Sequence, residues 1–155
     1  MKRRRAKKRK EIRKVDDVMK MDDAMKRFET IGVIPVVVLE SADDAEGVAD
    51  ALCDGGLPCA EVTFRTDCAA EVIARMSRQR PDMFVGAGTV LTPEQVNEAV
   101  QAGAQFIVSP GTNMEVVRRC QEIGVPVVPG VQTPTEIEAG IRAGLPVLKF
   151  FPAEA

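Results

Sequence analysis

The sequence predicts an α/β fold, a (β/α)8 TIM barrel of which the 155 residues supply about six βα units. Short apolar runs alternate with amphipathic segments at a spacing of roughly 20 to 25 residues, as successive βαβ units require. The runs are apolar at nearly every position, which is typical of parallel strands covered on both faces. Residues 92–103 and 133–144 also have the same cap-to-glycine length, two units apart. Repeating pairs of units favour a barrel over a doubly wound sheet.

Six apolar runs are the predicted strands, each followed or preceded by a helical segment. They cover residues 34–39, 60–64, 83–87, 106–108, 125–128 and 147–151. The stretch G-A-G-T-V-L at 86–91 lacks the third glycine of a dinucleotide-binding fingerprint. This absence also disfavours a nucleotide-binding sheet.

Six segments place apolar residues at helical spacing and are the predicted helices. They cover residues 16–30, 45–52, 69–77, 93–102, 114–123 and 134–143. Thr92 and Thr133 are each followed by proline and, three residues on, by Gln or Glu, which predicts a helix N-cap. Glycines at 55, 103, 124 and 144 are expected to end helices, because glycine adopts positive φ without strain.

The composition excludes several kinds of chemistry. The chain has no His, so Ser-His and Cys-His nucleophile pairs and His-ligated metals are absent. The cysteines at 53, 59, 68 and 120 have no metal-ligand spacing and are expected to be free thiols. No apolar stretch is long enough to span a bilayer and no secretory pattern opens the chain. We therefore expect a cytoplasmic protein that does not associate with membranes.

Positive charge is concentrated at the N-terminus. Residues 1–14 hold ten Lys or Arg and one Glu, which leaves 11 basic and 22 acidic residues in the rest of the chain. We expect residues 1–20 to be a disordered basic extension and residues 21–155 to form the barrel domain. The alternatives are an arm that binds nucleic acid or another anionic polymer, and a start codon upstream of a true first residue at Met19 or Met21. The chain has no Trp or Tyr on which single-stranded nucleic acid would stack.

The strand over residues 60–64 is followed and interrupted by charged residues. Side chains alternate along a strand, so Glu61, Thr63 and Arg65 are predicted to share one face and Val62 and Phe64 the other. If the apolar pair packs against helices, the polar three point into the barrel. The alternative is a salt-bridge network at the rim. Because about 13 Å of strand separates the Glu and Arg, each is expected to have its own partner.

Lys149 lies in the middle of the strongly apolar strand over residues 147–151. Residues 92–103 and 133–144 contain the two predicted helices of the internal repeat, and each is followed by a predicted strand. Val108 in the earlier strand matches Lys149 in the later one, so an interior position that holds valine in one unit holds an amine in the other. Burial disfavours the ammonium form and frees the neutral amine as a nucleophile toward carbonyls. The alternative is a lysine that extends its ammonium group to water from the end of the strand.

Together these residues indicate Schiff-base chemistry on a keto acid. Lys149 would attack the ketone, Arg65 would hold the carboxylate, and Glu61 would move protons between carbinolamine, imine and enamine. This chemistry requires no metal or organic cofactor.

Five segments carry a family resemblance over about residues 21–155. They are E-V-T-F-R-T at 61–66, V-G-A-G-T-V at 85–90, F-I-V-S-P-G at 106–111, P-G at 129–130 and K-F-F-P-A-E at 149–154. In this order they resemble the 2-dehydro-3-deoxy-phosphogluconate (KDPG) aldolase family, also called 4-hydroxy-2-oxoglutarate aldolase. The resemblance implies a homotrimeric class I aldolase of carbohydrate metabolism. Its reaction would cleave 2-dehydro-3-deoxy-6-phosphogluconate to pyruvate and glyceraldehyde 3-phosphate, the last step of the Entner–Doudoroff route.

The resemblance also implies roles for individual residues. Lys149 would form the Schiff base and Glu61 would be the general acid and base. Two residues, Arg65 and Thr89, would hold the pyruvate carboxylate, and two more, Pro110 and Phe151, would line the pocket.

Members of the family continue through two more βα units, whose loops and helix N-terminus bind the substrate phosphate. We therefore expect this chain to be a fragment, or to be completed by another chain. Specificity for the aldehyde half lies mostly in those units, so sister aldolases for 4-hydroxy-2-oxoglutarate or the galactonate epimer remain alternatives. A further alternative is an inactive barrel remnant that serves as a scaffold or binds anionic polymers through residues 2–14.

Overall fold

A computed structural model describes residues 20–154, which form a curved sheet of six parallel strands alternating with helices. The strands are β1 (Val36–Val37), β2 (Cys59–Thr63), β3 (Phe84–Gly88), β4 (Ile107–Ser109), β5 (Val127–Val131) and β6 (Lys149–Phe150). The helices are α1 (Met21–Ile31), α2 (Ala45–Asp54), α3 (Ala69–Gln79), α4 (Pro93–Ala102), α5 (Met114–Ile123) and α6 (Pro134–Arg142), with a short 3-10 helix, η2 (Ala42–Asp44), before α2.

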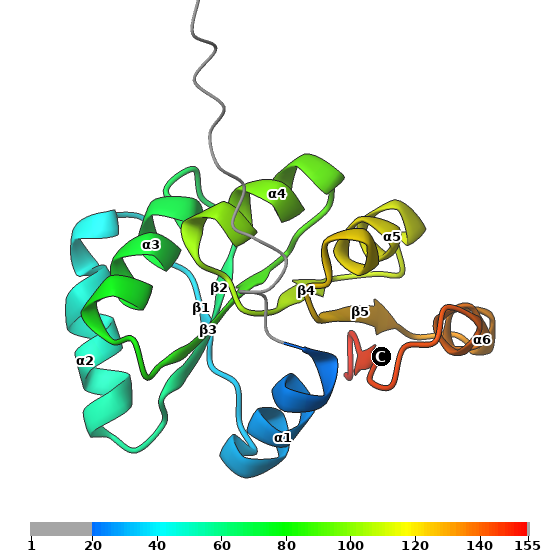
Figure 1. Ribbon diagram of the computed structural model, residues 1–155, viewed down its shortest axis with the longest axis horizontal. Coiled ribbons are helices and arrows are strands. Elements are labelled where there is room, and N and C mark those ends of the chain that lie inside the picture. The colour runs from blue at the N-terminus through cyan, green and yellow to red at the C-terminus, as the bar shows by residue number, and fades with distance from the viewer. Residues whose placement is uncertain (1–19, 155) are drawn as a thin grey trace, which may run out of the picture.

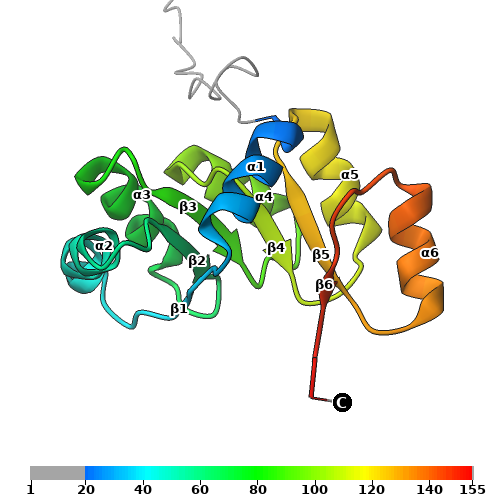
Figure 2. The same ribbon diagram turned by 90° about the horizontal axis from the view of Figure 1, so that it is seen from below.

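The strands follow one another across the sheet in the order of the sequence, from β1 to β6. A doubly wound sheet would reverse direction partway, so this order confirms the barrel prediction. Helices α2 to α6 cover the convex outer side of the sheet, whereas α1 lies on the concave side (Figures 1 and 2). The described part of the chain is therefore a half-barrel with an inner and an outer face.

The predicted elements differ from the observed ones mainly at their ends. The strand predicted over 34–39 is reduced to Val36–Val37, since it lies at the edge of the sheet and pairs with β2 alone. The strand predicted over 60–64 ends at Thr63, so Arg65 lies in a turn and not on the strand. In contrast, β5 continues through Pro129 and Gly130 to Val131.

The first predicted helix, over residues 16–30, corresponds to α1. Lys20 has an extended backbone, so the described helix begins at Met21. Residues 1–19, and with them most of the predicted disordered extension and the alternative anion-binding arm, lie outside the described residues.

Within residues 20–154 no helix is long and apolar enough to cross a membrane.

The helix caps follow the sequence prediction at most positions. The Thr92 hydroxyl accepts from the Gln95 backbone N–H at 3.2 Å, and Thr133 forms a complete capping box with Glu136. The glycines at 103 and 124 end their helices in the left-handed conformation, and the glycine at 144 adopts it one residue after the cap of α6. Helix α2 ends at its C-cap Gly55, as predicted, but the positive φ is adopted by the next residue, Gly56.

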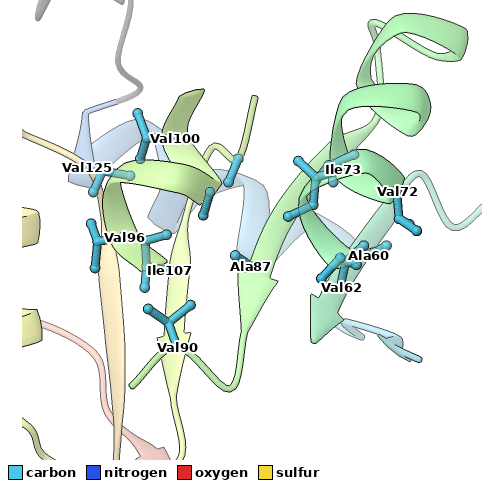
Figure 3. Packing of buried hydrophobic residues seen from close by; sticks show 14 of the residues in the cluster. Ala60, Val62, Val72, Ile73, Ala87, Val90, Val96, Val100, Ile107 and Val125 are labelled. Atoms are coloured by element: carbon cyan, nitrogen blue, oxygen red, sulfur yellow. The ribbon is translucent and has the colours of Figure 1, made fainter. Parts of the chain in front are cut away.

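The core has two layers, one on each face of the sheet. On the outer face, alternate strand residues such as Ala60, Val62 and Ile107 pack against α3 and α4, which contribute Ile73 and Val96 (Figure 3). The inner layer consists of Cys59, Phe84, Phe106, Val108 and Val128, packed against Ala24 and Phe28 of α1. Strand residues thus alternate between the two layers, which fixes the direction of each side chain in the site below.

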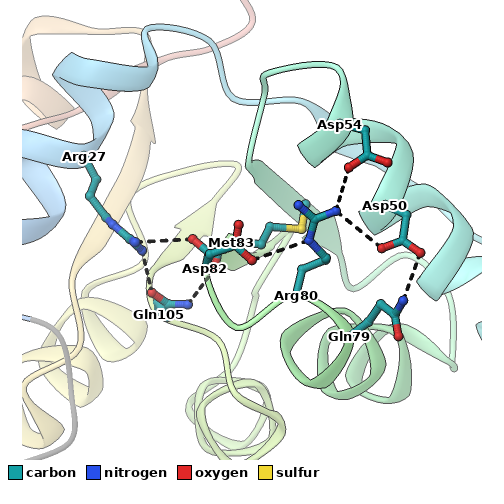
Figure 4. A network of polar contacts seen from close by, with 8 residues as sticks. All are labelled: Arg27, Asp50, Asp54, Gln79, Arg80, Asp82, Met83 and Gln105. Atoms are coloured by element: carbon teal, nitrogen blue, oxygen red, sulfur yellow. Dashed lines mark hydrogen bonds and ion pairs between the residues drawn. The ribbon is translucent and has the colours of Figure 1, made fainter.

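Helix α1 covers the N-terminal ends of the strands. The Arg27 guanidinium donates to Gln105 Oε1 at 3.1 Å and to the Asp82 carbonyl at 3.4 Å, and it lies 5.1 Å from the centroid of the Phe84 ring. Gln105 in turn donates to the Met83 carbonyl at 3.0 Å (Figure 4). These contacts join α1 to the starts of β3 and β4, which leaves the C-terminal ends of the strands as the open end of the half-barrel.

Candidate active site

Lys149 and Glu61 form an ion pair on the inner face. Lys149 Nζ lies 3.3 Å from Glu61 Oε1 and 3.5 Å from Oε2. The two residues come from β6 and β2, which are not neighbours in the sheet, so the pair bridges the concave side of the half-barrel. Only 7% of the glutamate side chain and 29% of the lysine side chain are exposed. The pair is therefore held away from bulk water but accessible from the open end.

Two glycines of β3 make room for the inner side chains. In the register of the sheet Glu61 lies opposite Gly86, and Thr63 lies opposite Gly88. A Cβ atom at Gly88 would overlap the carboxylate and Cγ of Glu61, and one at Gly86 would overlap the Phe106 ring. Glycine within a strand often marks such a close approach. Gly88 thus allows the Glu61 side chain to lie across β3 toward the open end.

The environment of Glu61 raises the pKa of its carboxyl group. Burial raises the pKa of Glu61, and this is the largest effect. The positive charge and hydrogen bond of Lys149, and then the charge of Arg65, lower the pKa but do not cancel the effect of burial. A carboxyl group whose pKa is raised gives up its proton less readily than an ordinary carboxyl group, so it is suited both to donate and to accept a proton during a reaction.

Three further predicted residues, Phe151, Thr89 and Pro110, each directly follow a strand. Phe151 is close, since Lys149 Nζ lies 5.2 Å from the centroid of its ring. Thr89 directly follows β3 and is the one residue other than glycine in the described range with positive φ, at 56°. Such strained backbone is concentrated at functional sites. Pro110 directly follows β4, so it too lies at the C-terminal ends of the strands.

The loop that carries Pro110 is fastened to β5. The Pro110 carbonyl packs directly against Gly130, where a Cβ atom would overlap it. The Thr112 hydroxyl donates to the Gly130 carbonyl at 2.8 Å, and the Ser109 hydroxyl donates to the Gly111 carbonyl at 2.8 Å. These contacts explain the glycine at 130, and they hold Pro110 at the rim of the site.

Arg65 is the predicted site residue whose position differs most from the expectation. Because β2 ends at Thr63, Arg65 is not part of the strand, although the prediction required it to be, and the alternation argument does not extend to it. Its side chain is exposed and makes no hydrogen bond or ion pair within residues 20–154. Its charge still acts on the Glu61 carboxylate. Arg65 therefore lies beside the site, and its guanidinium N–H groups are available to bind a ligand.

Two of the four cysteines, Cys59 and Cys120, are buried. All four cysteines are free, as predicted. Burial raises the pKa of Cys59 and of Cys120 to about 12, so both remain protonated at neutral pH and are poor nucleophiles.

The sheet order and the inward Lys–Glu pair at the C-terminal ends of the strands define the chain as part of a (β/α)-barrel protein, in which active sites lie at that end. Residues 23–155 match the model of the KDPG and KHG aldolase family. The chain therefore belongs to the KDPG and KHG aldolase family, as the motifs of the sequence indicate.

Two relatives and two solved structures illustrate the similarity. The chain is 54% identical over 126 residues to the 2-dehydro-3-deoxy-phosphogluconate aldolase of Treponema pallidum, covering 81% of this chain and 60% of the relative. It is 44% identical to the Haemophilus influenzae protein of the same name over 129 residues, covering 83% and 61%. The chain thus spans about three fifths of the length of these relatives.

A Zymomonas mobilis 2-keto-3-deoxy-6-phosphogluconate aldolase, solved with 3-phosphoglycerate, superposes with a TM-score of 0.77 at 39% identity, covering 84% of this chain and 64% of that one. A KDPG aldolase from Legionella pneumophila, with pyruvate captured at low pH as a covalent carbinolamine intermediate, superposes with a TM-score of 0.75 at 40% identity, covering 78% and 59%.

Proposed function

We propose that the protein is a class I aldolase, and that these 155 residues supply its Schiff-base half. The observation that carries the proposal is the ion pair between Lys149 and Glu61 on the inner face, at the C-terminal ends of the strands. An amine beside a carboxyl group whose pKa burial raises has both functions that imine chemistry needs, a nucleophile and a proton donor.

The proposed reaction starts with proton transfer from the Lys149 ammonium to the Glu61 carboxylate. The neutral amine adds to the C2 ketone and gives a carbinolamine, and Glu61 then protonates the C2 hydroxyl, which leaves as water. The product is an iminium ion on Lys149 and a Glu61 carboxylate. This carboxylate takes the proton of the C4 hydroxyl while the C3–C4 bond breaks, which releases an aldehyde and leaves an enamine. Protonation at C3 and hydrolysis return pyruvate and the free lysine.

The remaining residues have binding roles in this proposal. Arg65, with its donors available in the turn after β2, and Thr89 at the end of β3 hold the carboxylate of the keto acid. Pro110 and Phe151 form the walls on either side of the reacting carbon. The carbinolamine captured in the Legionella relative, which is 40% identical, supports pyruvate as the bound half of the substrate.

The proposed substrate is 2-dehydro-3-deoxy-6-phosphogluconate, which gives pyruvate and glyceraldehyde 3-phosphate. The names of the Treponema and Haemophilus relatives support this choice. The alternative substrate, 4-hydroxy-2-oxoglutarate, is supported by the Escherichia coli KHG/KDPG aldolase, which is 43% identical over 123 residues. Both substrates have the same keto-acid half, so the residues described above would serve either reaction.

The test is to incubate the protein separately with these two compounds and with the galactonate epimer, and to follow the release of pyruvate. We expect the fastest release from 2-dehydro-3-deoxy-6-phosphogluconate, and no release from any compound with the Lys149→Ala variant. Faster release from 4-hydroxy-2-oxoglutarate would change the assigned substrate. Release that persists in Lys149→Ala would overturn the proposed chemistry.

A further inference from the structure

Thr63 has a buried hydroxyl group without a partner beside the ion pair. The fully buried polar residues of the range 20–154 are Glu61, Thr63 and Ser109. A second buried hydroxyl without a partner, Ser77 Oγ, belongs to helix α3 and lies beside Gly103. Glu61 is paired with Lys149, and the Ser109 hydroxyl donates to a backbone carbonyl. The Thr63 residue is only 1% exposed, yet its Oγ1 makes no hydrogen bond. A buried hydroxyl that is unpaired destabilises the fold, so this one requires an explanation.

The position of Thr63 in the sheet places this hydroxyl next to the Glu61 carboxyl group. Thr63 follows Glu61 by two residues in β2, and Val62 between them packs on the outer face, so both polar side chains belong to the inner face. Thr63 lies opposite Gly88 in the register of β2 and β3, and the Glu61 carboxyl group occupies the space beside that same glycine. The Thr63 hydroxyl and the Glu61 carboxyl group therefore belong to the same inner face, beside Gly88.

We propose that Thr63 is a further catalytic residue of the imine-forming step. Its hydroxyl donates a hydrogen bond to the C2 hydroxyl of the carbinolamine on Lys149. This contact holds the oxygen in position while Glu61 transfers its proton to it and the C2–O bond breaks. The oxygen leaves as water, Glu61 becomes the carboxylate, and the nitrogen of Lys149 becomes the iminium. This inference rests on the proposed function.

Two substitutions separate the hydroxyl group from the shape of the side chain. Thr63→Val keeps the branched shape and removes the unpaired hydroxyl, so it should leave the unfolding temperature unchanged or raise it. Thr63→Ser keeps the hydroxyl and removes the methyl group. For each variant the rate of pyruvate adduct formation, trapped with borohydride and followed by mass, is compared with that of the unsubstituted protein, together with the unfolding temperature.

We expect Thr63→Val to form the adduct about tenfold more slowly, the loss that corresponds to one hydrogen bond, and Thr63→Ser to stay within about threefold of the original rate. Adduct formation by Thr63→Val at the original rate, or an equal loss in both variants, would overturn the catalytic role of Thr63 alone. A lower unfolding temperature in Thr63→Val would show that the hydroxyl is structural and would overturn it as well. Failure of the unsubstituted protein to form any adduct would instead overturn the proposed function, and this inference with it.

Discussion

Substituting alanine for Gly88 changes the site without replacing a catalytic side chain. Gly88 has no unusual φ, so alanine is compatible with its backbone. The added methyl group, however, would lie within 3.0 Å of three side-chain atoms of Glu61, a distance that real Cβ atoms essentially never show. Since Cγ is among these atoms, rotation of the carboxylate alone does not relieve the overlap. The Glu61 side chain must leave its place beside Lys149.

Two effects of Gly88→Ala can be given as magnitudes. Overpacking of a well-packed interior costs about 1–3 kcal/mol of folding free energy. Displacement of the proposed acid and base should slow formation of the pyruvate adduct by about a hundredfold, the lower end of what a positioned proton donor contributes. Chemical unfolding gives the first quantity, and borohydride trapping of the adduct over time gives the second.

Gly47→Ala is the matched control for this experiment. Gly47 lies in α2 and has nothing within 4 Å of the position that its Cβ would occupy. Alanine there should stabilise the protein by about 0.5–1 kcal/mol and leave adduct formation unchanged. If Gly88→Ala were as stable and as reactive as the unsubstituted protein, the assigned position of the Glu61 carboxyl group would be refuted.

Four further outcomes follow from the structure. Glu61→Gln should slow adduct formation but leave the fold intact, which trapping kinetics and far-UV circular dichroism measure together. Gly86→Ala should destabilise the protein by about 1–3 kcal/mol, measured by chemical unfolding, because the methyl group would overlap the buried Phe106 ring; equal stability would contradict the packing of the inner layer. Thr133→Ala should cost about 1 kcal/mol through the lost cap. The backbone N–H groups of residues 132 and 133 and the Thr133 hydroxyl lower the pKa of Glu136 below 4.5, so its stabilising effect is present above that value and is lost as the pH falls through its folded-state pKa. Thermal unfolding of Glu136→Gln should accordingly show a smaller loss of stability on acidification than the unsubstituted protein, and an identical loss would contradict this capping role.

The periodicity of the sequence was sufficient to predict the order and type of the elements. Runs that are apolar at nearly every position predicted strands covered on both faces. The two core layers explain this pattern, because alternate strand residues pack against the outer helices and against α1. The ends of strands were predicted less well. The sequence E-V-T-F-R alternates like a strand through Arg65, but the last residue pair with β3 is Thr63 with Gly88, and the last backbone hydrogen bond runs from Phe64 N–H to the Gly88 carbonyl. Alternation alone does not encode that limit.

The site was predicted in part. Lys149 and Glu61 were recognisable because charged residues are rare in buried strands, and the structure brings them to 3.3 Å. The importance of Gly88 and Gly130 was missed, although glycine within a strand is a signal of close approach. Gly88 faces the Glu61 carboxyl group, and Gly130 faces the Pro110 carbonyl. The first contact depends on the curvature of the sheet, and the second depends on a loop that is distant in the sequence. The unpaired hydroxyl of Thr63 likewise appears only when its surroundings are assembled.

The central claim is that the Lys149 amine forms a Schiff base with a keto acid. The most direct measurement is to treat the protein with pyruvate and borohydride, digest it, and locate the added mass by peptide mass spectrometry. The account predicts a single pyruvyl adduct on Lys149, absent when pyruvate is omitted and absent in Lys149→Ala. A folded protein that gains no adduct, or one that carries the adduct on another lysine, would contradict it.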